Sequence, residues 1–522
     1  MSGKGRGRGP LAFFLSAWRR RQRPESVIDR AYAAWLRREP APSVWRARVA
    51  ALARPPRISV VMPVHDPNPA FLRDAIASVR RQIYPHWELV IADDASADPA
   101  IAVCLKEIAD DPRVEIVRRE TRGGISVATN AALAHTDGDY VAFLDHDDVL
   151  APHALAVAAC AFAEDPRLEL VFSDEDQLIE GKRRRPYFKP GWNPDLLLSQ
   201  NLICHLAVYR RTLVTELGGM RPDMAGAQDY DLALRVVEKI GGHRIRHVPL
   251  ILYHWRQSAT SFSATDTERC REAARRAVTL HLQGRATVGM NPALPQWPSV
   301  HFHPPATPPS ISVVGARHGV AEQAYDPALV EYVGDAGLAT GEVLLFLSPR
   351  LVAQDTGWLR ALVAQLGRPE TGAAGALLLD RGERWLNTGY ILHPRHIVQT
   401  LAPPSDTEDP GYRGQFALPR TVSAVSLDCL AVRREVFDAA RGFMAEAADF
   451  RGVDLSLRLA ARGLRTVWTP WARLRYMAPP RAPSTGAAWM RQRWRDVLRA
   501  DPYHNPHLGL RRGQVVLRAA DT

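Results

Sequence analysis

The sequence predicts an α/β fold, and three features of its first half support that prediction. Residues 58–62 and 88–92 form two largely apolar runs. Residues 70–82, which lie between them, have the spacing of a helix that buries one face. A strand, a helix and a strand in this order are the unit of a parallel sheet.

The following segments continue this alternation. We expect further helices and strands in the order helix, strand, helix, strand at residues 101–110, 114–117, 126–134 and 140–144. Acidic residues follow two of the expected strands, at Asp93 and Asp94 and again at 145–148. Ligands of such sheets bind beyond the carboxyl ends of the strands, so one crevice is expected to hold both acidic clusters.

The length of the chain predicts two domains. Its 522 residues exceed the roughly 250 to 300 that one hydrophobic core organises. Apolar spacing at 25–53 indicates a helical lead-in, and a proline-rich stretch indicates an extended linker. The expected parts are a basic N-terminal tail with the lead-in (1–56), a first α/β domain (57–290), the linker (291–309), a second domain (310–480) and a helical or extended C-terminal tail (481–522).

The second domain has the features of a diverged copy of the first. Three pairs of segments support this interpretation, namely 58–61 with 311–314, 138–144 with 341–347, and 230–235 with 453–458. The repeated positions are mainly apolar, which is what a shared core requires.

The charge balance leaves several kinds of partner open. Lys and Arg number 67 against 56 Asp and Glu, giving a net charge of +11. Nucleic acid, anionic lipid and phosphorylated small molecules all suit such a charge. No recognisable nucleic-acid-binding module accompanies it, so nucleic acid is not an expected partner.

The cysteines and apolar runs indicate a cytoplasmic protein. The five cysteines are far apart and never form a CxxC pair, which is typical of reduced thiols. The apolar run at 11–18 is too short to cross a membrane. Its basic flanks leave two interpretations of the N-terminus, peripheral contact with the inner face of the cell membrane or a solvated tail.

The acidic turn after the fourth expected strand predicts a metal site. Asp145 and Asp147 offer oxygen ligands of the kind that hold Mg²⁺ or Mn²⁺, and such an ion neutralises a bound diphosphate. The alternative is a solvated acidic turn without a ligand.

Several motifs in chain order resemble the family-2 glycosyltransferases of the GT-A fold. The resemblance covers most of the chain from Ile58 onward, particularly members assigned to bacterial surface-polysaccharide and O-antigen assembly. It is carried by the segments 58–65, 91–96, 123–130, 143–148, 173–176, 188–195, 228–232 and 253–256.

This resemblance implies roles for individual residues. The nucleotide-sugar donor would contact Pro63, His65, Asp93 and Asp94, with Asp145 near the ribose. Asp145, Asp147 and His254 would hold Mn²⁺ or Mg²⁺. A lone histidine is more often a core or surface residue, so a structural role for His254 stays open.

Asp229 lies where the family carries its catalytic base. Inverting transfer needs one carboxylate to take the proton of the acceptor hydroxyl. The alternative is that Asp229 or Asp231 is only a carboxylate at a helix N-terminus, and Asp231 suits that use better because Asp454 repeats it.

The second copy lacks the chemical groups of the first. Alignment sets Ser348, Pro349 and Arg350 against residues 145–147, and it sets Gly452 and Met477 against Asp229 and His254. We therefore expect a degenerate, noncatalytic domain. It would bind acceptor, position a partner, form an oligomer or act as a structural support.

The predicted function is transfer of a sugar from a nucleotide-diphosphate sugar to a glycan or lipid-linked acceptor in cell-surface polysaccharide synthesis. The enzyme would be inverting, metal-dependent and non-processive, because the sequence has neither transmembrane helices nor the Gln-x-x-Arg-Trp motif of processive synthases. The remaining alternative is a noncatalytic glycan-binding or scaffold protein.

Overall fold

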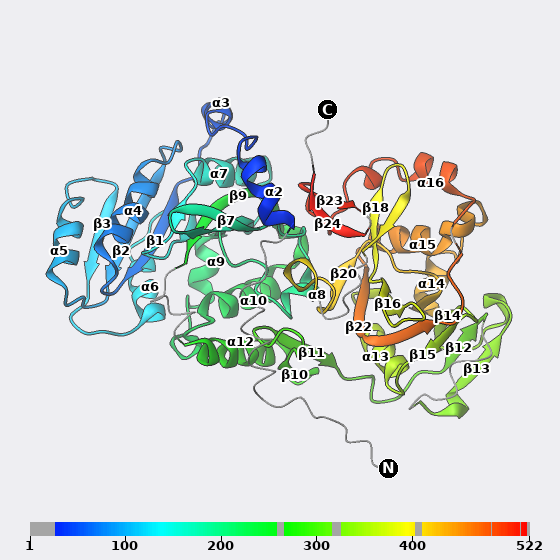
Figure 1. The fold of residues 1–522 in the computed structure, drawn as a ribbon. Helices are drawn as coiled ribbons and strands as arrows, with labels where there is room; N and C mark the ends of the chain where they lie inside the picture. Colours follow the sequence, from blue (N-terminus) through cyan, green and yellow to red (C-terminus); the bar gives the residue numbers. More distant parts are fainter. Residues whose placement is uncertain are drawn as a thin grey trace, which may run out of the picture.

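The computed structural model describes residues 27–257, 266–315, 325–401, 410–481, 483–511 and 513–518. Two α/β domains, each built on a mixed sheet, lie side by side (Figure 1). The predicted α/β fold is therefore confirmed. The basic tail that was considered for membrane contact lies outside the described residues, and no helix within them is both long and apolar enough to span a bilayer.

The first sheet has four parallel strands followed by a mixed part. Its strand order is β3 (Val114–Arg118), β2 (Trp87–Asp93), β1 (Ile58–Val64), β4 (Tyr140–Phe143), β8 (Ala207–Arg210), β6 (Leu170–Ile179), β9 (Ile245–Arg256) and β5 (Val149–Leu150), with β7 (Lys182–Tyr187) beside β6. β1 and β2 are buried along their whole length, which explains why their sequences are continuous apolar runs rather than alternating ones.

Helices cover both faces of this sheet. Along β1, Ile58, Val60 and Met62 belong to one apolar cluster, whereas Val61 belongs to the other. The first cluster receives α4 (Pro69–Arg80), α5 (Pro99–Lys106) and α7 (Ala154–Glu164). The second receives α6 (Ile125–Leu133), α9 (Arg211–Glu216), α10 (Gln228–Ile240) and α12 (Thr267–Leu282).

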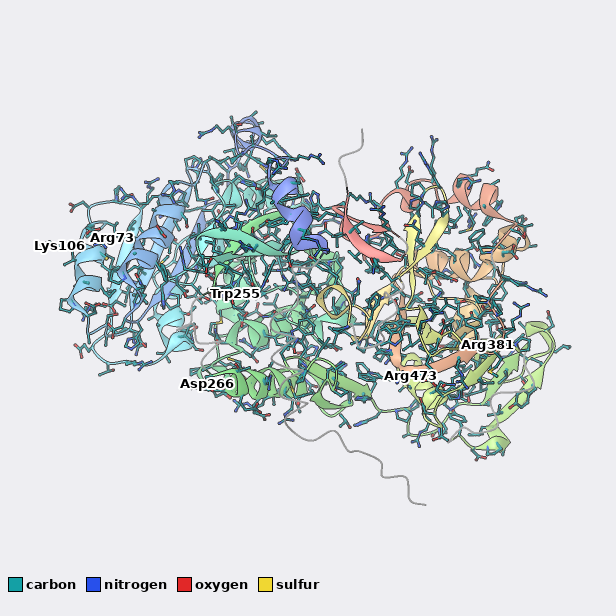
Figure 2. The ribbon with its side chains drawn as sticks, in the orientation of Figure 1. Arg73, Lys106, Trp255, Asp266, Arg381 and Arg473 are labelled. Atoms are coloured by element: carbon teal, nitrogen blue, oxygen red, sulfur yellow. The ribbon has the colours of Figure 1, made fainter. Side chains whose placement is uncertain are left out.

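The second sheet repeats the strand order of the first without a counterpart of β3. Its order is β13 (Val330–Val333), β12 (Ile311–Val314), β14 (Val343–Leu347), β21 (Cys429–Arg433), β16 (Thr371–Leu379), β22 (Arg465–Tyr476) and β15 (Leu351–Ala353), with β17 (Trp385–Asn387) beside β16 and β20 (Arg420–Val422) beside β22. Its helices are α13 (Trp358–Leu366), α14 (Arg434–Ala439) and α15 (Arg451–Ala460), and β18 (Tyr390–His393) pairs with β19 (Ile397–Thr400). In Figure 2 the labelled Trp255 and Arg473 lie in the corresponding strands β9 and β22.

A buried ion pair recurs in both copies. Arg235 bonds Asp231 at 2.8 Å and donates to the carbonyls of Leu217 and Gly219. In the second copy, Arg458 bonds Asp454 at 2.7 Å and donates to two carbonyls in the same way. Asp231 therefore has the structural use that its repetition in the sequence indicated.

Part of the proline-rich stretch is a strand. β11 (Pro298–Phe302) pairs antiparallel with β10 (Ala286–Met290), so this stretch is not a wholly extended linker. Proline is tolerated as the first residue of a strand, and Val300 gains burial in the core of the first domain.

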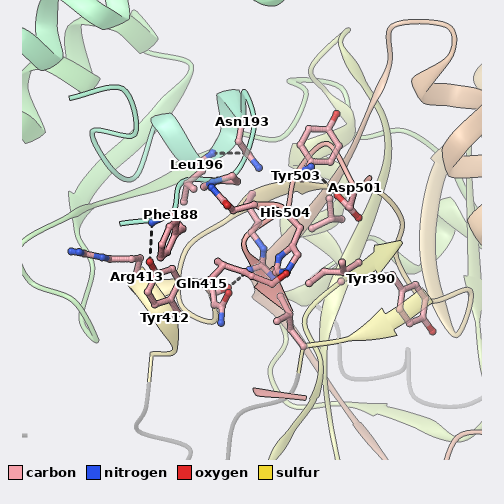
Figure 3. A pocket seen from close by; sticks show the side chains of 18 of the residues that line it. Phe188, Asn193, Leu196, Tyr390, Tyr412, Arg413, Gln415, Asp501, Tyr503 and His504 are labelled. Atoms are coloured by element: carbon pink, nitrogen blue, oxygen red, sulfur yellow. Dashed lines mark hydrogen bonds between the residues drawn. The ribbon is translucent and has the colours of Figure 1, made fainter. Parts of the chain in front are cut away.

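The ends of the described chain pack where the two domains meet. α2 (Val27–Leu36) and the hairpin of β23 (Leu508–Arg511) and β24 (Gln514–Leu517) share one apolar cluster with side chains of both domains. Figure 3 shows this region, where Phe188 of the first domain, Tyr412 of the second and His504 near the C-terminus lie close together. The remaining helices are α3 (Val44–Ala50), α8 (Pro194–Leu197) and α16 (Ala487–Arg493).

Candidate active site

The acidic turn after β4 is tied to the neighbouring strand β9. Asp148 is fully buried and accepts hydrogen bonds from the Tyr253 hydroxyl at 2.6 Å and from the Arg256 amide at 2.6 Å. The Asp145 amide donates to the same Tyr253 hydroxyl at 3.3 Å. Asp148 therefore fixes the shape of the turn that presents Asp145 and Asp147.

The turn concentrates negative charge in a poorly solvated place. Burial, together with the charges of Asp145 and Asp147, raises the pKa of Asp148 well above the usual range of a carboxyl group. Burial also raises the pKa of Asp145. The nearby His205 lowers this pKa, and the charge of Asp147 raises it further. Such a cluster is stabilised by a cation, which offsets the mutual repulsion of the carboxylates.

His205 lies between the acidic turn and Asp229. One set of potential ligand atoms, all within 4.8 Å of one another, comes from Asp145, Asp148 and His205. A second such set comes from Cys204, His205 and Asp229. The structure thus brings together Asp145 and Asp229, which are far apart in the sequence, through a histidine that the sequence analysis missed.

Buried side chains hold the segment that carries His205. Lys189 is fully buried and donates to the His205 carbonyl at 2.6 Å. Its ammonium group also pairs with Glu175 at 3.0 Å, and the His205 amide donates to the same carboxylate at 3.3 Å. The His205 ring stacks on Tyr253 with a centroid separation of 4.4 Å. These contacts give His205 a defined orientation.

Asp229 is positioned by a helix and by an amide side chain. It is the second residue of α10, where carboxylates interact favourably with the helix dipole. Its Oδ2 accepts a hydrogen bond from the Asn201 amide at 2.7 Å. Among the described residues, no protein group donates a hydrogen bond to the other carboxylate oxygen, so we assign that oxygen to chemistry.

The predicted donor-side residues gather at the carboxyl ends of β1 and β2. Asp94 accepts hydrogen bonds from the amides of Gly123 at 2.9 Å and Gly124 at 2.7 Å. The His65 ring lies 3.0 Å from the Asp94 carbonyl oxygen. Gly124 has a φ of 86°, which a residue with a side chain rarely adopts, so this glycine permits the loop that reaches Asp94.

Two further contacts connect this region to its neighbours. The His146 ring lies 3.1 Å from the Pro63 carbonyl, which joins the end of β1 to the acidic turn. Asp93 is fully buried, accepts a hydrogen bond from the Ser96 amide at 2.9 Å and pairs with Arg118. In this structure Asp93 shapes the loop after β2.

His254 does not join Asp145 and Asp147. Consecutive side chains of a strand point to opposite faces, so His254 faces away from the side that Tyr253 occupies. Its ring lies 2.6 Å from Asp176, which also accepts from the Tyr32 hydroxyl at 2.5 Å and from Arg183 at 2.6 Å. In this structure His254 is therefore part of the network that holds α2, and the metal role expected for it stays a prediction.

Sequence reasoning had no strong signal for His205. It lies in a segment of mixed character before β8, and no spacing links it to Asp145 or Asp229. Only the antiparallel pairing of β8 with both β4 and β6 brings this segment to the acidic turn.

Comparison with known proteins identifies a family for part of the chain. The model of glycosyl transferase family 2 matches residues 59–218. The chain is 35% identical to the O-antigen biosynthesis protein RfbC of Myxococcus xanthus, over 93% of this chain and 43% of that protein. It is 32% identical to the uncharacterized protein y4gI of Sinorhizobium fredii, over 88% of this chain and 58% of that protein.

The chain thus spans about half the length of these curated relatives. Among solved structures, TarS 1-349 of S. aureus in complex with UDP-GlcNAc aligns with 44% of this chain and 67% of that chain, with 19% identity and a TM-score of 0.37. The family assignment therefore rests on the first domain, whose residues 59–218 match glycosyl transferase family 2.

Proposed function

We propose that the first domain, residues 57–290, is an inverting glycosyltransferase that moves a sugar from a nucleoside-diphosphate sugar to a hydroxyl group of a glycan or lipid-linked acceptor. The observation that carries the proposal is the convergence of Asp145, His205 and Asp229 beside the acidic turn. Similarity to an O-antigen biosynthesis protein supports a role in surface-polysaccharide assembly.

Asp229 is the proposed catalytic base. As the acceptor oxygen forms a bond to the anomeric carbon, its proton passes to the Asp229 carboxylate. The bond between the anomeric carbon and the diphosphate oxygen breaks on the opposite side of the sugar, and the nucleoside diphosphate leaves with the electron pair. Asn201 holds one carboxylate oxygen, which leaves the other to accept the proton.

The residues around the turn suit Mn²⁺ or Mg²⁺. Carboxylate oxygens and an imidazole nitrogen are ligands that Mn²⁺ accepts, and Mg²⁺ binds through carboxylates and phosphates. We assign Asp145, Asp147 and His205 to this ion, because Asp148 is already engaged by Tyr253 and Arg256. When bound, the ion would neutralise charge on the leaving diphosphate.

The base and ribose of the donor are assigned to the ends of β1 and β2. Pro63, His65, Asp93 and Asp94 lie there, and the contact between His146 and Pro63 places the acidic turn beside them. A cytoplasmic site of action, with acceptor at the inner face of the membrane, completes the proposal, and the five free thiols accord with a reducing compartment.

Transfer activity after substitution of Asp229 tests the proposal. UDP-, dTDP- and GDP-sugars would first be screened with Mn²⁺ by thermal shift to identify the donor. Asp229→Asn should then lower turnover at least about a hundredfold while donor affinity is retained. The matched control is Asp223→Asn, because Asp223 is an exposed carboxylate in an ion pair with Arg276.

Unchanged turnover in Asp229→Asn would refute the assignment of the base. Asp147→Ala should abolish the effect of Mn²⁺ on nucleoside-diphosphate affinity measured by isothermal titration. A wild-type protein that binds glycan but transfers no sugar from any donor would favour the scaffold alternative.

A further inference from the structure

The second domain retains a cavity where the first has its candidate active site. This cavity has a volume of about 370 Å³, and Ser348, Arg350, Asp428 and Gly452 are among its lining residues. The strand pairings of the two copies place Ser348, Arg350 and Asp428 at the positions of Asp145, Asp147 and His205. The repeated ion pairs of α10 and α15 place Gly452 at the position of Asp229. The second domain therefore keeps a cavity at this position, but the side chains that line it are different.

The cavity is lined by positively charged side chains, whereas the acidic turn of the first domain is negatively charged. Arg350, Arg451 and Arg481 line it. Within the described part of the chain, none of the three forms an ion pair with a carboxylate. Arg350 donates one hydrogen bond to the Pro479 carbonyl at 2.9 Å, and Arg451 lies 5.7 Å from the centre of the Phe443 ring. Their guanidinium groups therefore keep donors for another anion.

The two carboxylates of the cavity are already engaged. Asp428 accepts a hydrogen bond from the Tyr476 hydroxyl at 2.5 Å. Hydrogen bonds from the amides of Ser484 and Thr485 lower the pKa of Asp449 to about 2. These carboxylates are held by protein donors, so they leave the arginines available to a ligand.

The two aspartates assigned to a nucleoside in the first domain have no counterpart here. Glu88 and Glu331 occupy equivalent places beside β1 and β12, each accepting a hydrogen bond from a serine of that strand. Asp93 and Asp94 lie five and six residues after Glu88. The residues at the same distances after Glu331 are Ala336 and Gly337. β13 and β14 are joined by a short 3₁₀ turn (Ala336–Leu338), whereas α5, β3 and α6 lie between β2 and β4.

We infer that this cavity binds an anionic saccharide, through a phosphate or carboxylate group, without a metal ion and without a nucleoside. Arg350 and Arg451 would pair with the anion. Tyr390 and Phe450 also line the cavity and offer aromatic surface to a sugar ring. The inference does not require transfer by the first domain, and it gives the degenerate copy a ligand of its own.

Ligand-observed NMR titration of the full chain in EDTA tests this inference. The probes are glucose 1-phosphate, glucuronic acid, neutral glucose and UDP. At least one of the two anionic sugars should bind, and comparison of the two distinguishes phosphate from carboxylate recognition. Glucose should not bind, and UDP should not displace the anionic sugar.

Substitution of the arginines locates the site. The double variant Arg350→Gln/Arg451→Gln should weaken anionic-sugar binding at least about tenfold, because two charge-assisted contacts are lost. Arg350→Lys keeps the charge and should lose less affinity. Arg462→Gln is the matched control, because Arg462 is exposed in the turn after α15 and lies outside the cavity.

Three results would overturn the inference. The first is that neither anionic sugar binds. The second is that Arg462→Gln weakens binding as much as the double variant does. The third is that Asp147→Ala in the first domain removes the binding while the arginine variants leave it intact. Circular dichroism confirms that each variant is folded before its affinity is compared.

Discussion

The Tyr253 hydroxyl donates a hydrogen bond of 2.6 Å to Asp148 and so ties the acidic turn to β9. In the second copy, the equivalent Tyr476 donates to Asp428 instead, because Leu351 stands where Asp148 would be. The tyrosine has been kept while its partner has changed.

Tyr253→Phe should destabilise the protein and also weaken donor binding. Asp148 would lose a buried donor, which costs about 1 to 3 kcal/mol in the free energy of unfolding. Thermal unfolding measures the first effect, and Mn²⁺-dependent nucleoside-diphosphate titration measures the second. Tyr476→Phe is the matched control, since it should destabilise the second domain and leave donor binding unchanged. Equal donor affinity in both variants would contradict the role given to the turn.

His205→Asn and His254→Asn should affect different properties, Mn²⁺ affinity and thermal stability respectively. The first removes a proposed metal ligand and should lower Mn²⁺ affinity at least about tenfold, as measured by electron paramagnetic resonance with nucleoside diphosphate present. The second breaks the contact with Asp176 and should lower the midpoint of thermal unfolding while Mn²⁺ affinity is retained. If His254→Asn were the variant that lost Mn²⁺, the metal role expected for His254 from the sequence would be supported and that of His205 refuted.

Asp195 should make the contact between the domains sensitive to acid. Burial would raise its pKa, but Arg368 and Arg465 of the second domain lower it to about 2. Because the folded-state pKa lies below the unfolded value, the stabilisation is present above about pH 4 and is lost as the pH falls toward 2. The pKa shift of Asp195 corresponds to about 2 kcal/mol in the free energy of unfolding.

Asp195→Asn should therefore reduce the free energy of unfolding at pH 7 by about 2 kcal/mol and flatten its dependence on pH between 4 and 2. Urea unfolding at several pH values measures this. Asp496→Asn is a suitable control, because Asp496 is exposed in a surface pair with Arg499. The same pH profile in wild type and Asp195→Asn would exclude this role.

Asp454→Asn should destabilise the second domain without affecting the reaction. Asp454 is fully buried and pairs with Arg458, so the substitution leaves a buried guanidinium without its partner, at a cost of about 3 kcal/mol or more. Differential scanning calorimetry should show the loss, and turnover at a temperature below unfolding should match wild type. A large loss of turnover there would mean that the second domain contributes to transfer.

Local patterns predicted much of the fold. The apolar runs at 58–62 and 88–92 became β1 and β2, and the helix expected at 126–134 is α6 within one residue at each end. Each of these elements is one continuous segment, so its apolar pattern and the turn residues at its ends can be recognised in the sequence. The hairpin of β10 and β11 was not predicted, because prolines interrupt the alternation that would reveal it.

The sequence by itself determined the alternation of strands and helices, the internal repeat, and the places of Asp145, Asp147 and Asp229 in motifs of one family. Only the tertiary structure decided which imidazole lies beside Asp145 and Asp229. On β9 a single step along the strand separates Tyr253, which faces the acidic turn, from His254, which faces Asp176. The face that a side chain takes depends on the pairing of its strand with β5 and β6, and long-range hydrogen bonds set that pairing.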